Sequence, residues 1–120
     1  MRILFLILFI LISNFSICQK YQGNAADTNK IKALIEQCDK ESKLNNANAL
    51  QTIRQAKELA KKTNSLYYGK TFLQEAYLYF DEGNYIKAIQ CFDTAATIFL
   101  GINDSIGYVK ANNNKGYQCL

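Results

Sequence analysis

The chain has 120 residues, of which 49% are apolar and 20% are charged, and its formal net charge is +4. This length suits one modest domain, and the N-terminal segment described next does not belong to that domain. Proline, histidine and tryptophan are absent. Helices can therefore run without proline breaks, and a catalytic triad with histidine, a zinc site with histidine ligands and a haem ligated by histidine are excluded within this chain.

Residues 1–18 have the layout of a secretory signal peptide. Arg2 is their only charged residue, residues 3–12 form an unbroken apolar run, and residues 16–18 offer a small-x-small site for cleavage after Cys18. Ten apolar residues fall short of the roughly 20 that a membrane-spanning helix needs. We therefore expect an exported protein, periplasmic or secreted, and rank this above the alternative of a buried N-terminal helix.

Cys18 raises a second alternative, because a lipoprotein signal also ends on a cysteine. Ile17 stands where such signals usually have Gly, Ala or Ser, so a lipid anchor at Cys18 is the less favoured interpretation.

A polar linker over 19–28 is expected to follow the signal peptide. Cleavage would lower the net charge from +4 to +3, since Arg2 is the only charge removed. The lysines are interleaved with acids, as in Lys57-Glu58, which is typical of a solvated mixed surface. We expect no binding of nucleic acid.

Three cysteines remain after cleavage: Cys38, Cys91 and Cys119. No CxxC motif is present, and an odd number allows at most one internal disulfide. We favour the alternative that they are small core residues, because free cysteine is among the most buried residue types.

From about residue 29 onward, apolar residues recur at steps of three and four, as in amphipathic helices. The clearest stripe has six members: Tyr85, Ala88, Ile89, Phe92, Ala96 and Phe99. Turns rich in asparagine separate the stripes, and no segment alternates with a period of two. The sequence therefore predicts an all-α fold. Its helices are expected near 29–43, 47–62, 66–82, 85–100 and 105–120.

The helices also repeat along the chain. Ala76 and Gly116 are 40 residues apart and each precedes a tyrosine, while Ala56 and Ala95 are 39 apart. A period of this length predicts a solenoid of antiparallel helix pairs, here about two and a half repeats of 39–40 residues over 29–120.

One repeat resembles the tetratricopeptide repeat (TPR) family. The resemblance rests on eight residues of the motif and on the glycine of the next repeat: Phe72, Ala76, Tyr79, Gly83, Tyr85, Ala88, Phe92, Ala95 and Gly116. It covers 69–100 well and the flanking helices in part. The period exceeds the standard 34 residues and resembles the extended repeats of exported N-terminal regions in bacterial TPR sensor proteins.

The chain departs from the family pattern in two ways. Glu75 and Lys115 stand where the family usually has leucine, and Leu100 replaces its usual proline. Because the first helices of neighbouring repeats run parallel, the sequence predicts an ion pair between Glu75 and Lys115.

In TPR proteins the first helix of each pair lines a concave groove that holds a peptide or a partner's helix. The resemblance places eight residues there: Lys70, Leu73, Tyr77, Phe80, Asp81, Lys110, Asn113 and Tyr117. Such an aromatic and basic groove suits a peptide with apolar side chains and an acidic end. The alternative is that the aromatic side chains pack against further repeats, or that the tyrosine hydroxyl groups are simply exposed to solvent.

Nothing in the sequence predicts an enzyme. Asp81 and Glu82 are adjacent, and Asp39 and Glu41 are two residues apart, so each pair would face different sides of a helix. No Gly-rich phosphate loop is present. We expect no catalytic residue, no metal and no cofactor.

The expected last helix, 105–120, has no second helix to cover its apolar side. We therefore expect a fragment. The resemblance implies that further repeats lead into a membrane helix and a signalling output module, which would make this chain the N-terminal sensory part of a membrane signal-transduction protein with a protein or peptide partner. The alternative is a self-contained secreted or lipid-anchored interaction protein, completed as a homo-oligomer through the open last helix.

Overall fold

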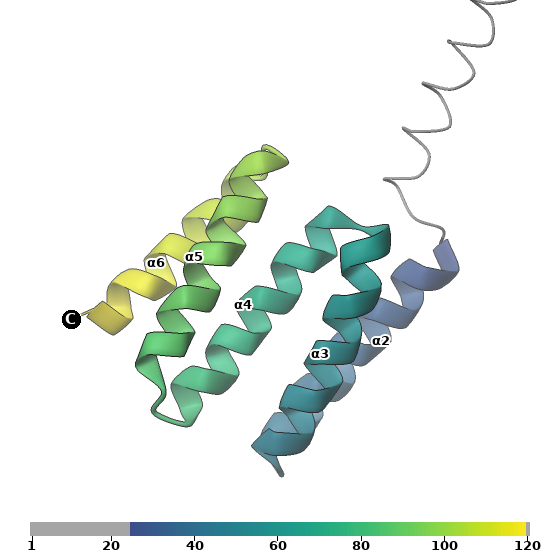
Figure 1. The fold of residues 1–120 in the computed structure, drawn as a ribbon, viewed down its shortest axis with the longest axis horizontal. Helices are drawn as coiled ribbons and strands as arrows, with labels where there is room; N and C mark the ends of the chain where they lie inside the picture. Colours follow the sequence, from purple (N-terminus) through teal and green to yellow (C-terminus); the bar gives the residue numbers. More distant parts are fainter. Residues whose placement is uncertain (1–24, 120) are drawn as a thin grey trace, which may run out of the picture.

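The computed structural model describes residues 25–119, which form five α-helices and no strand within that range (Figure 1). The expected all-α class is confirmed. The helices are α2 (Ala25–Ser42), α3 (Asn46–Thr63), α4 (Ser65–Asp81), α5 (Tyr85–Gly101) and α6 (Ser105–Cys119). None of these helices is long and apolar enough to cross a membrane. The expected signal peptide and residues 19–24 of the expected linker lie outside the described residues.

The first described helix begins earlier than the apolar stripe indicates. Helix α2 starts at Ala25, four residues before the expected start near 29, so residues 25–28 are helical and not part of a linker. Alanine has the highest helix propensity, and Asp27 in the first turn interacts favourably with the helix dipole. A helix start that depends on helix propensity and charge cannot be detected from the pattern of apolar residues.

Asparagine and aspartate side chains cap the following helices. The Oδ1 atoms of Asn45, Asn64, Asn84 and Asp104 accept hydrogen bonds from backbone N–H groups in the first turns of α3, α4, α5 and α6. These bonds satisfy donors that have no partner inside the helix. The turn residues of the sequence therefore set the helix boundaries.

Helices α4 and α5 end in the same way. Gly83 (φ 80°) and Asn103 (φ 58°) follow them in the left-handed region. The next residue then donates a hydrogen bond back to the helix, from Asn84 N to Tyr79 O at 2.9 Å and from Asp104 N to Phe99 O at 2.8 Å. Glycine and asparagine are the residues that adopt this conformation at least cost.

Replacing Gly83 by alanine should lower the free energy of unfolding by about 1 kcal/mol, because a Cβ atom disfavours the left-handed region. No neighbour lies within 4 Å of the position of that Cβ, so the loss would be conformational and not steric. Gly101→Ala is the matched control, since Gly101 also has open space but no positive φ. Urea unfolding followed by circular dichroism measures both changes. An equal effect of the two substitutions would contradict the explanation.

Consecutive helices pack side by side in antiparallel order, and α2 also contacts α4 (Figure 1). A hydrogen bond from Asn114 Nδ2 to the Tyr77 hydroxyl, 2.6 Å long, connects α6 to α4. Helices α2, α4 and α6 therefore form one row, and α3 and α5 pack against it from the other side.

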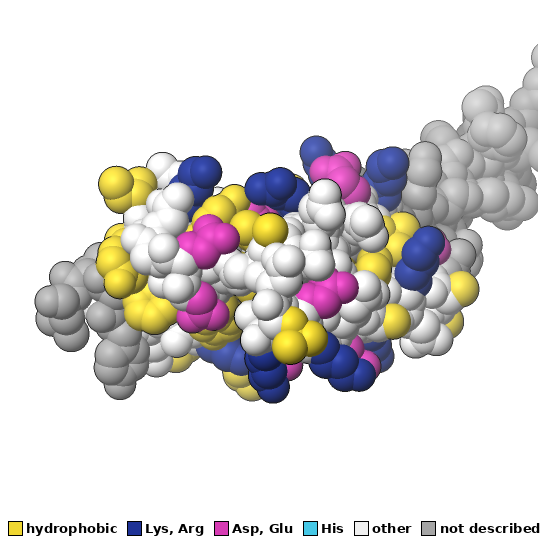
Figure 2. All heavy atoms as spheres, turned by 90° about the horizontal axis from the view of Figure 1, so that it is seen from below, with side chains coloured by type: hydrophobic (Ala, Val, Ile, Leu, Met, Phe, Trp, Pro, Cys, Tyr) yellow, Lys and Arg dark blue, Asp and Glu magenta, His cyan; other side chains and the backbone are white. Residues whose placement is uncertain are grey.

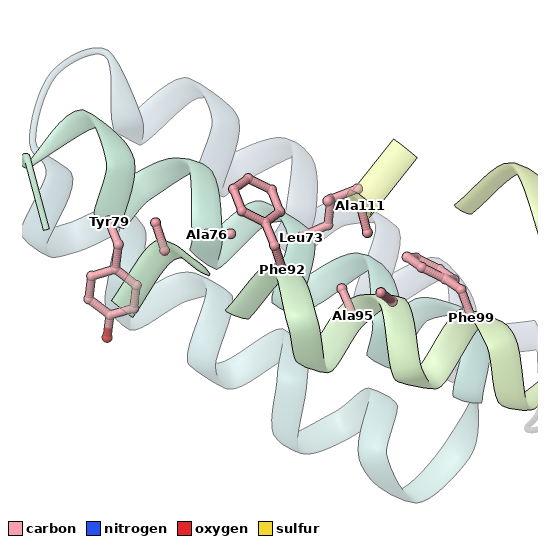
Figure 3. Close-up of a cluster of buried hydrophobic side chains, with 9 residues drawn as sticks. Leu73, Ala76, Tyr79, Phe92, Ala95, Phe99 and Ala111 are labelled. Atoms are coloured by element: carbon pink, nitrogen blue, oxygen red, sulfur yellow. The ribbon is translucent and has the colours of Figure 1, made fainter. Parts of the chain in front are cut away.

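The larger core cluster lies where α4, α5 and α6 meet (Figure 3). Leu73, Ala76 and Tyr79 of α4 belong to this cluster together with Phe92 and Phe99 of α5. Ala76 has no exposed surface, so its small side chain allows α4 and α5 to approach closely. A second cluster joins α2, α3 and α4 and contains Cys38, Ala49, Ile53, Ala56 and Leu78.

Two glycines make room for one aromatic ring. A Cβ atom on Gly69 of α4 would lie 2.8 Å from Phe99 Cε1, and one on Gly107 of α6 would lie 2.7 Å from Phe99 Cγ. Phe99 of α5 thus packs directly against the backbones of both neighbouring helices.

The prediction of an ion pair between Glu75 and Lys115 is wrong. Glu75 pairs with Lys57 of α3, and Lys115 pairs with Asp93 of α5 at 2.6 Å. Each of the two residues contacts the second helix of the preceding pair, because that helix packs directly against its own. The parallel arrangement of α4 and α6 does not bring the two side chains together.

Candidate functional site

A cleft of about 510 Å³ crosses the row of α2, α4 and α6. Its lining comes from all three helices and from the end of α5: Ile35, Leu66, Lys70, Leu73, Gln74, Tyr77, Phe99, Asp104, Ile106, Gly107 and Lys110. We call this cleft the groove.

Helix α4 forms the middle of the groove. Apart from the adjacent Leu73 and Gln74, its five lining residues follow one another at steps of three or four, which places them on one side of the helix. Leu73 and Phe99 are almost fully buried and form an apolar floor. Lysine, glutamine and tyrosine side chains surround this floor. An apolar surface with a few polar groups is the usual composition of a binding site.

Tyr77 is held in place from two sides. Its ring makes an edge-to-face contact with Phe92, with ring centroids 5.6 Å apart, and its hydroxyl oxygen accepts the hydrogen bond from Asn114. Burial raises the pKa of Tyr77, and the hydrogen bond from Asn114 partly opposes that shift. The phenol is therefore a rigid, uncharged wall of the groove.

Charge in the groove is dominated by lysine. Lys70 Nζ lies 4.9 Å from the centroid of the Tyr67 ring, and Lys110 lines the opposite side. Asp104 supplies a carboxylate, but its Oδ1 accepts the hydrogen bond of Gly107 N at 3.1 Å and so caps α6. On the molecular face shown in Figure 2, by contrast, acidic and basic side chains are interspersed.

Four of the eight residues expected in the groove line it, namely Lys70, Leu73, Tyr77 and Lys110. Asn113 lines an adjoining depression of about 560 Å³ on α6, which shares Ile106 and Lys110 with the groove. The side chain of Tyr117 lies outside the described residues.

Phe80 and Asp81 do not line the groove. They lie at the end of α4, where both are exposed and the Phe80 ring packs against Tyr85 with centroids 5.4 Å apart. Three helical turns separate Phe80 from Lys70, so the last turn of α4 lies beyond the end of the cleft.

Several lining residues were missed from the sequence. Leu66 and Gln74 could have been found, because they lie four residues before and after Lys70 on the same face of α4. Ile35, Phe99 and Ile106 come from other helices, and only packing brings them to the groove.

A second depression, of about 550 Å³, lies between α2 and α3. Its apolar part is formed by Leu34 and Leu59, and it is also lined by the basic residues Lys30, Arg54 and Lys62. The Arg54 guanidinium donates to the Tyr79 hydroxyl at 3.4 Å and is thereby tied to the core of the protein.

Among residues 25–119, no group of three His, Cys, Asp or Glu side chains is placed to hold a metal ion. Cys38 and Cys91 carry free thiols. Burial, with a smaller contribution from nearby Glu41 for the first and Glu75 for the second, raises the pKa of each thiol to about 11.

Alkylation of Cys91 should therefore be slow. With a pKa of about 11, roughly one thiol in a thousand is ionised at pH 8, and the rate should rise about tenfold per pH unit up to that pKa. Mass spectrometry of the peptide that carries Cys91 after iodoacetamide treatment measures the rate. Protein unfolded in guanidinium is the control and should react at the rate of an ordinary thiol. Equal rates in folded and unfolded protein would contradict the burial argument.

Comparison of this chain with models of known protein families, with curated proteins and with solved structures finds no match. The geometry of the groove is therefore the basis for a functional argument.

Proposed function

We propose that this chain is an exported helical-repeat scaffold of the tetratricopeptide type, and that its groove binds a segment of a partner protein. The observation that carries the proposal is the groove itself. Three helices from distant parts of the chain line a single cleft that has an apolar floor and polar walls. Such a surface can accept a chain laid across the helices, with apolar side chains in the floor.

The packing of α4 against α5 supports the repeat type. Ala76 and Ala88 are fully buried, and Phe92 fills the space beside them. Gly83 forms the left-handed turn between the two helices. These are the positions on which the resemblance to the family rests.

Within this proposal, the chain is the N-terminal sensory part of a membrane signalling protein, and the groove is where the signal is received. The apolar N-terminal segment supports export.

A second candidate is a self-contained interaction protein that forms a homo-oligomer through α6. The observation in its favour is the exposed apolar face of that helix, where Ile106 is 84% and Val109 52% exposed. Light scattering over a range of protein concentrations tests this candidate, which requires a dimer or larger assembly.

The groove is tested by selecting binding peptides from a displayed random library against the purified chain. Peptides that bind in the groove should bind the Ile106→Glu variant at least tenfold more weakly than the original chain, because the Ile106 side chain lines the cleft. Leu44→Glu is the matched control, since Leu44 is 90% exposed and lies in the turn between α2 and α3, outside the groove. Failure to select any peptide, or equal binding to both variants, would overturn the proposal.

A further inference from the structure

We infer that one end of the molecule docks on an anionic membrane surface. This end, which we call the basic end, is where α2, α4 and α6 begin and where α3 and α5 end, and it lies at the top of Figure 1. The inference goes beyond the proposed function, because the residues that carry it do not line the groove: Lys30, Lys32, Lys61, Lys62 and Ile102.

Positive and negative charges are interleaved in the sequence but are separated in the fold. When each helix is divided near its midpoint, the half of the molecule toward the basic end consists of residues 25–33, 55–73 and 94–112. This half carries seven lysines and three acidic residues, a net charge of +4. The remaining described residues carry five basic and seven acidic residues, a net charge of −2. Figure 2 looks onto the opposite end, where acidic and basic side chains are interspersed. The molecule therefore presents its positive end to an anionic surface.

Contacts between helices join the lysines of the basic end into one surface. Lys30 of α2 and Lys62 of α3 line the same depression. The centroid of the Tyr67 ring in α4 lies 5.8 Å from Lys32 Nζ and 4.9 Å from Lys70 Nζ. All four lysines are exposed, and each lies within about two turns of the end of its helix. Lysines close to an anionic bilayer add up their attraction to it.

Exposed aliphatic side chains lie at the same end. Leu100, near the end of α5, is 61% exposed, and Ile102, in the turn that follows, is 38% exposed. Ile106 of α6 lines the groove together with Lys70, so it lies beside the basic surface. Proteins that bind membrane surfaces combine lysines, which attract anionic headgroups, with aliphatic and aromatic side chains that enter the headgroup region. The basic end carries both kinds of side chain.

The path of the chain also brings the basic end to a membrane. Helix α2 begins at this end, so the residues before it join the fold there. They include the apolar run of residues 3–12, which belongs to the proposed export signal. Residues 13–24 connect this run to α2 and can span at most about 40 Å. While the apolar run is in the membrane, the basic end is therefore held near the bilayer.

A nucleic acid or an acidic protein could also attract lysines. A nucleic acid supplies phosphates but no apolar layer for Leu100 and Ile102. A bilayer supplies anionic headgroups with acyl chains directly beneath them, over an area as wide as the whole basic end. An acidic protein would meet the lysines equally well, but the path of the chain favours the bilayer.

The inference is tested with the exported chain, residues 19–120, which contains every described helix and lacks the apolar run. Co-sedimentation measures its binding to vesicles of phosphatidylcholine that contain about 30% phosphatidylglycerol, with vesicles of phosphatidylcholine alone as the reference. We expect binding to the anionic vesicles to be about tenfold tighter or more. Raising the NaCl concentration from about 0.05 M to about 0.5 M should weaken it about tenfold, because salt screens exposed charges.

The double variant Lys61→Gln/Lys62→Gln should bind the anionic vesicles about tenfold more weakly, because both lysines lie in the last turn of α3 at the basic end. The matched control is Lys40→Gln/Lys43→Gln. It removes the same charge from exposed lysines in the last turn of α2 and the turn that follows, at the opposite end of the molecule. The control should change binding less than about twofold. Circular dichroism of each variant checks that it remains folded.

The aliphatic contact is tested by Ile102→Ser, which should weaken binding to the anionic vesicles about two- to fivefold, because the turn would lose its apolar contact with the bilayer. Ile86→Ser is the matched control, since Ile86 is 75% exposed and lies in the first turn of α5, at the opposite end. This control should leave the affinity unchanged.

Equal weakening by the two double variants would show that only net charge matters, and would overturn the inference. Binding that is undetectable, or equal for neutral and anionic vesicles, would overturn it as well. Unchanged binding of Ile102→Ser would contradict the docked orientation. Tighter binding to oligothymidylate or to polyglutamate than to the anionic vesicles would overturn the inference in favour of a nucleic acid or an acidic protein. The proposed function is tested separately by the displayed peptide library, and its outcome does not depend on vesicle binding.

Discussion

Replacing Phe92 by alanine should lower the free energy of unfolding by about 3–5 kcal/mol, the usual cost of removing a fully buried phenylalanine. Phe92 has no exposed surface, and its ring contacts Tyr77 edge to face. The cavity would open between α4 and α5, at the centre of the larger core cluster. Because small domains are stable by only about 5–15 kcal/mol, most of the stability would be lost. Urea unfolding followed by circular dichroism measures the change.

Phe80→Ala is the control for this substitution. Phe80 is 40% exposed and contacts Tyr85 at the end of α4, so its removal should cost about 1 kcal/mol. A loss below 1 kcal/mol for Phe92→Ala, or one no larger than that of Phe80→Ala, would show that the packing between α4 and α5 differs from the one described.

Replacing Lys57 by methionine should cost about 3 kcal/mol, because it leaves a buried carboxylate without its partner. The Glu75 side chain is only 8% exposed, and Lys57 is its ion-pair partner while also lying over the Phe72 ring. The double variant Lys57→Met/Glu75→Leu should recover most of the lost stability, since it removes the unpaired charge as well. Chemical unfolding of the single and double variants gives the interaction energy.

Lys115→Met is the matched control, because it breaks the second ion pair, with Asp93, whose side chains are 35% and 53% exposed. Exposed pairs contribute about 0–1 kcal/mol, so this substitution should change stability little. If the double variant remained as unstable as Lys57→Met, the loss of stability would come from the missing packing of the lysine side chain and not from the unpaired Glu75 carboxylate.

The local features of this fold could be predicted from the sequence. Asparagine or aspartate side chains begin four of the helices, and Gly83 ends one of them, because caps and turns depend on residues only a few positions apart. The apolar stripe of α5 likewise predicted the burial of Ala88, Phe92, Ala96 and Phe99, although its first member, Tyr85, is 52% exposed.

Features that depend on packing between helices could not be predicted in the same way. The partner of Glu75 is decided by which helix lies against it, and the sequence offered both Lys57 and Lys115. Half of the expected groove residues line the groove because they share one face of α4 or α6, whereas Phe80 shares that pattern but lies past the end of the cleft.

Each helix packs mainly against its neighbours in sequence, and this arrangement affects how fast the chain folds. The connections between helices are one to three residues long, and most contacts join residues of adjacent helices. Little chain entropy is lost when an adjacent pair closes, so folding should be fast, in the microsecond-to-millisecond range of helical proteins dominated by local contacts. Any adjacent pair can form first, and the remaining helices can then add in either direction along the chain.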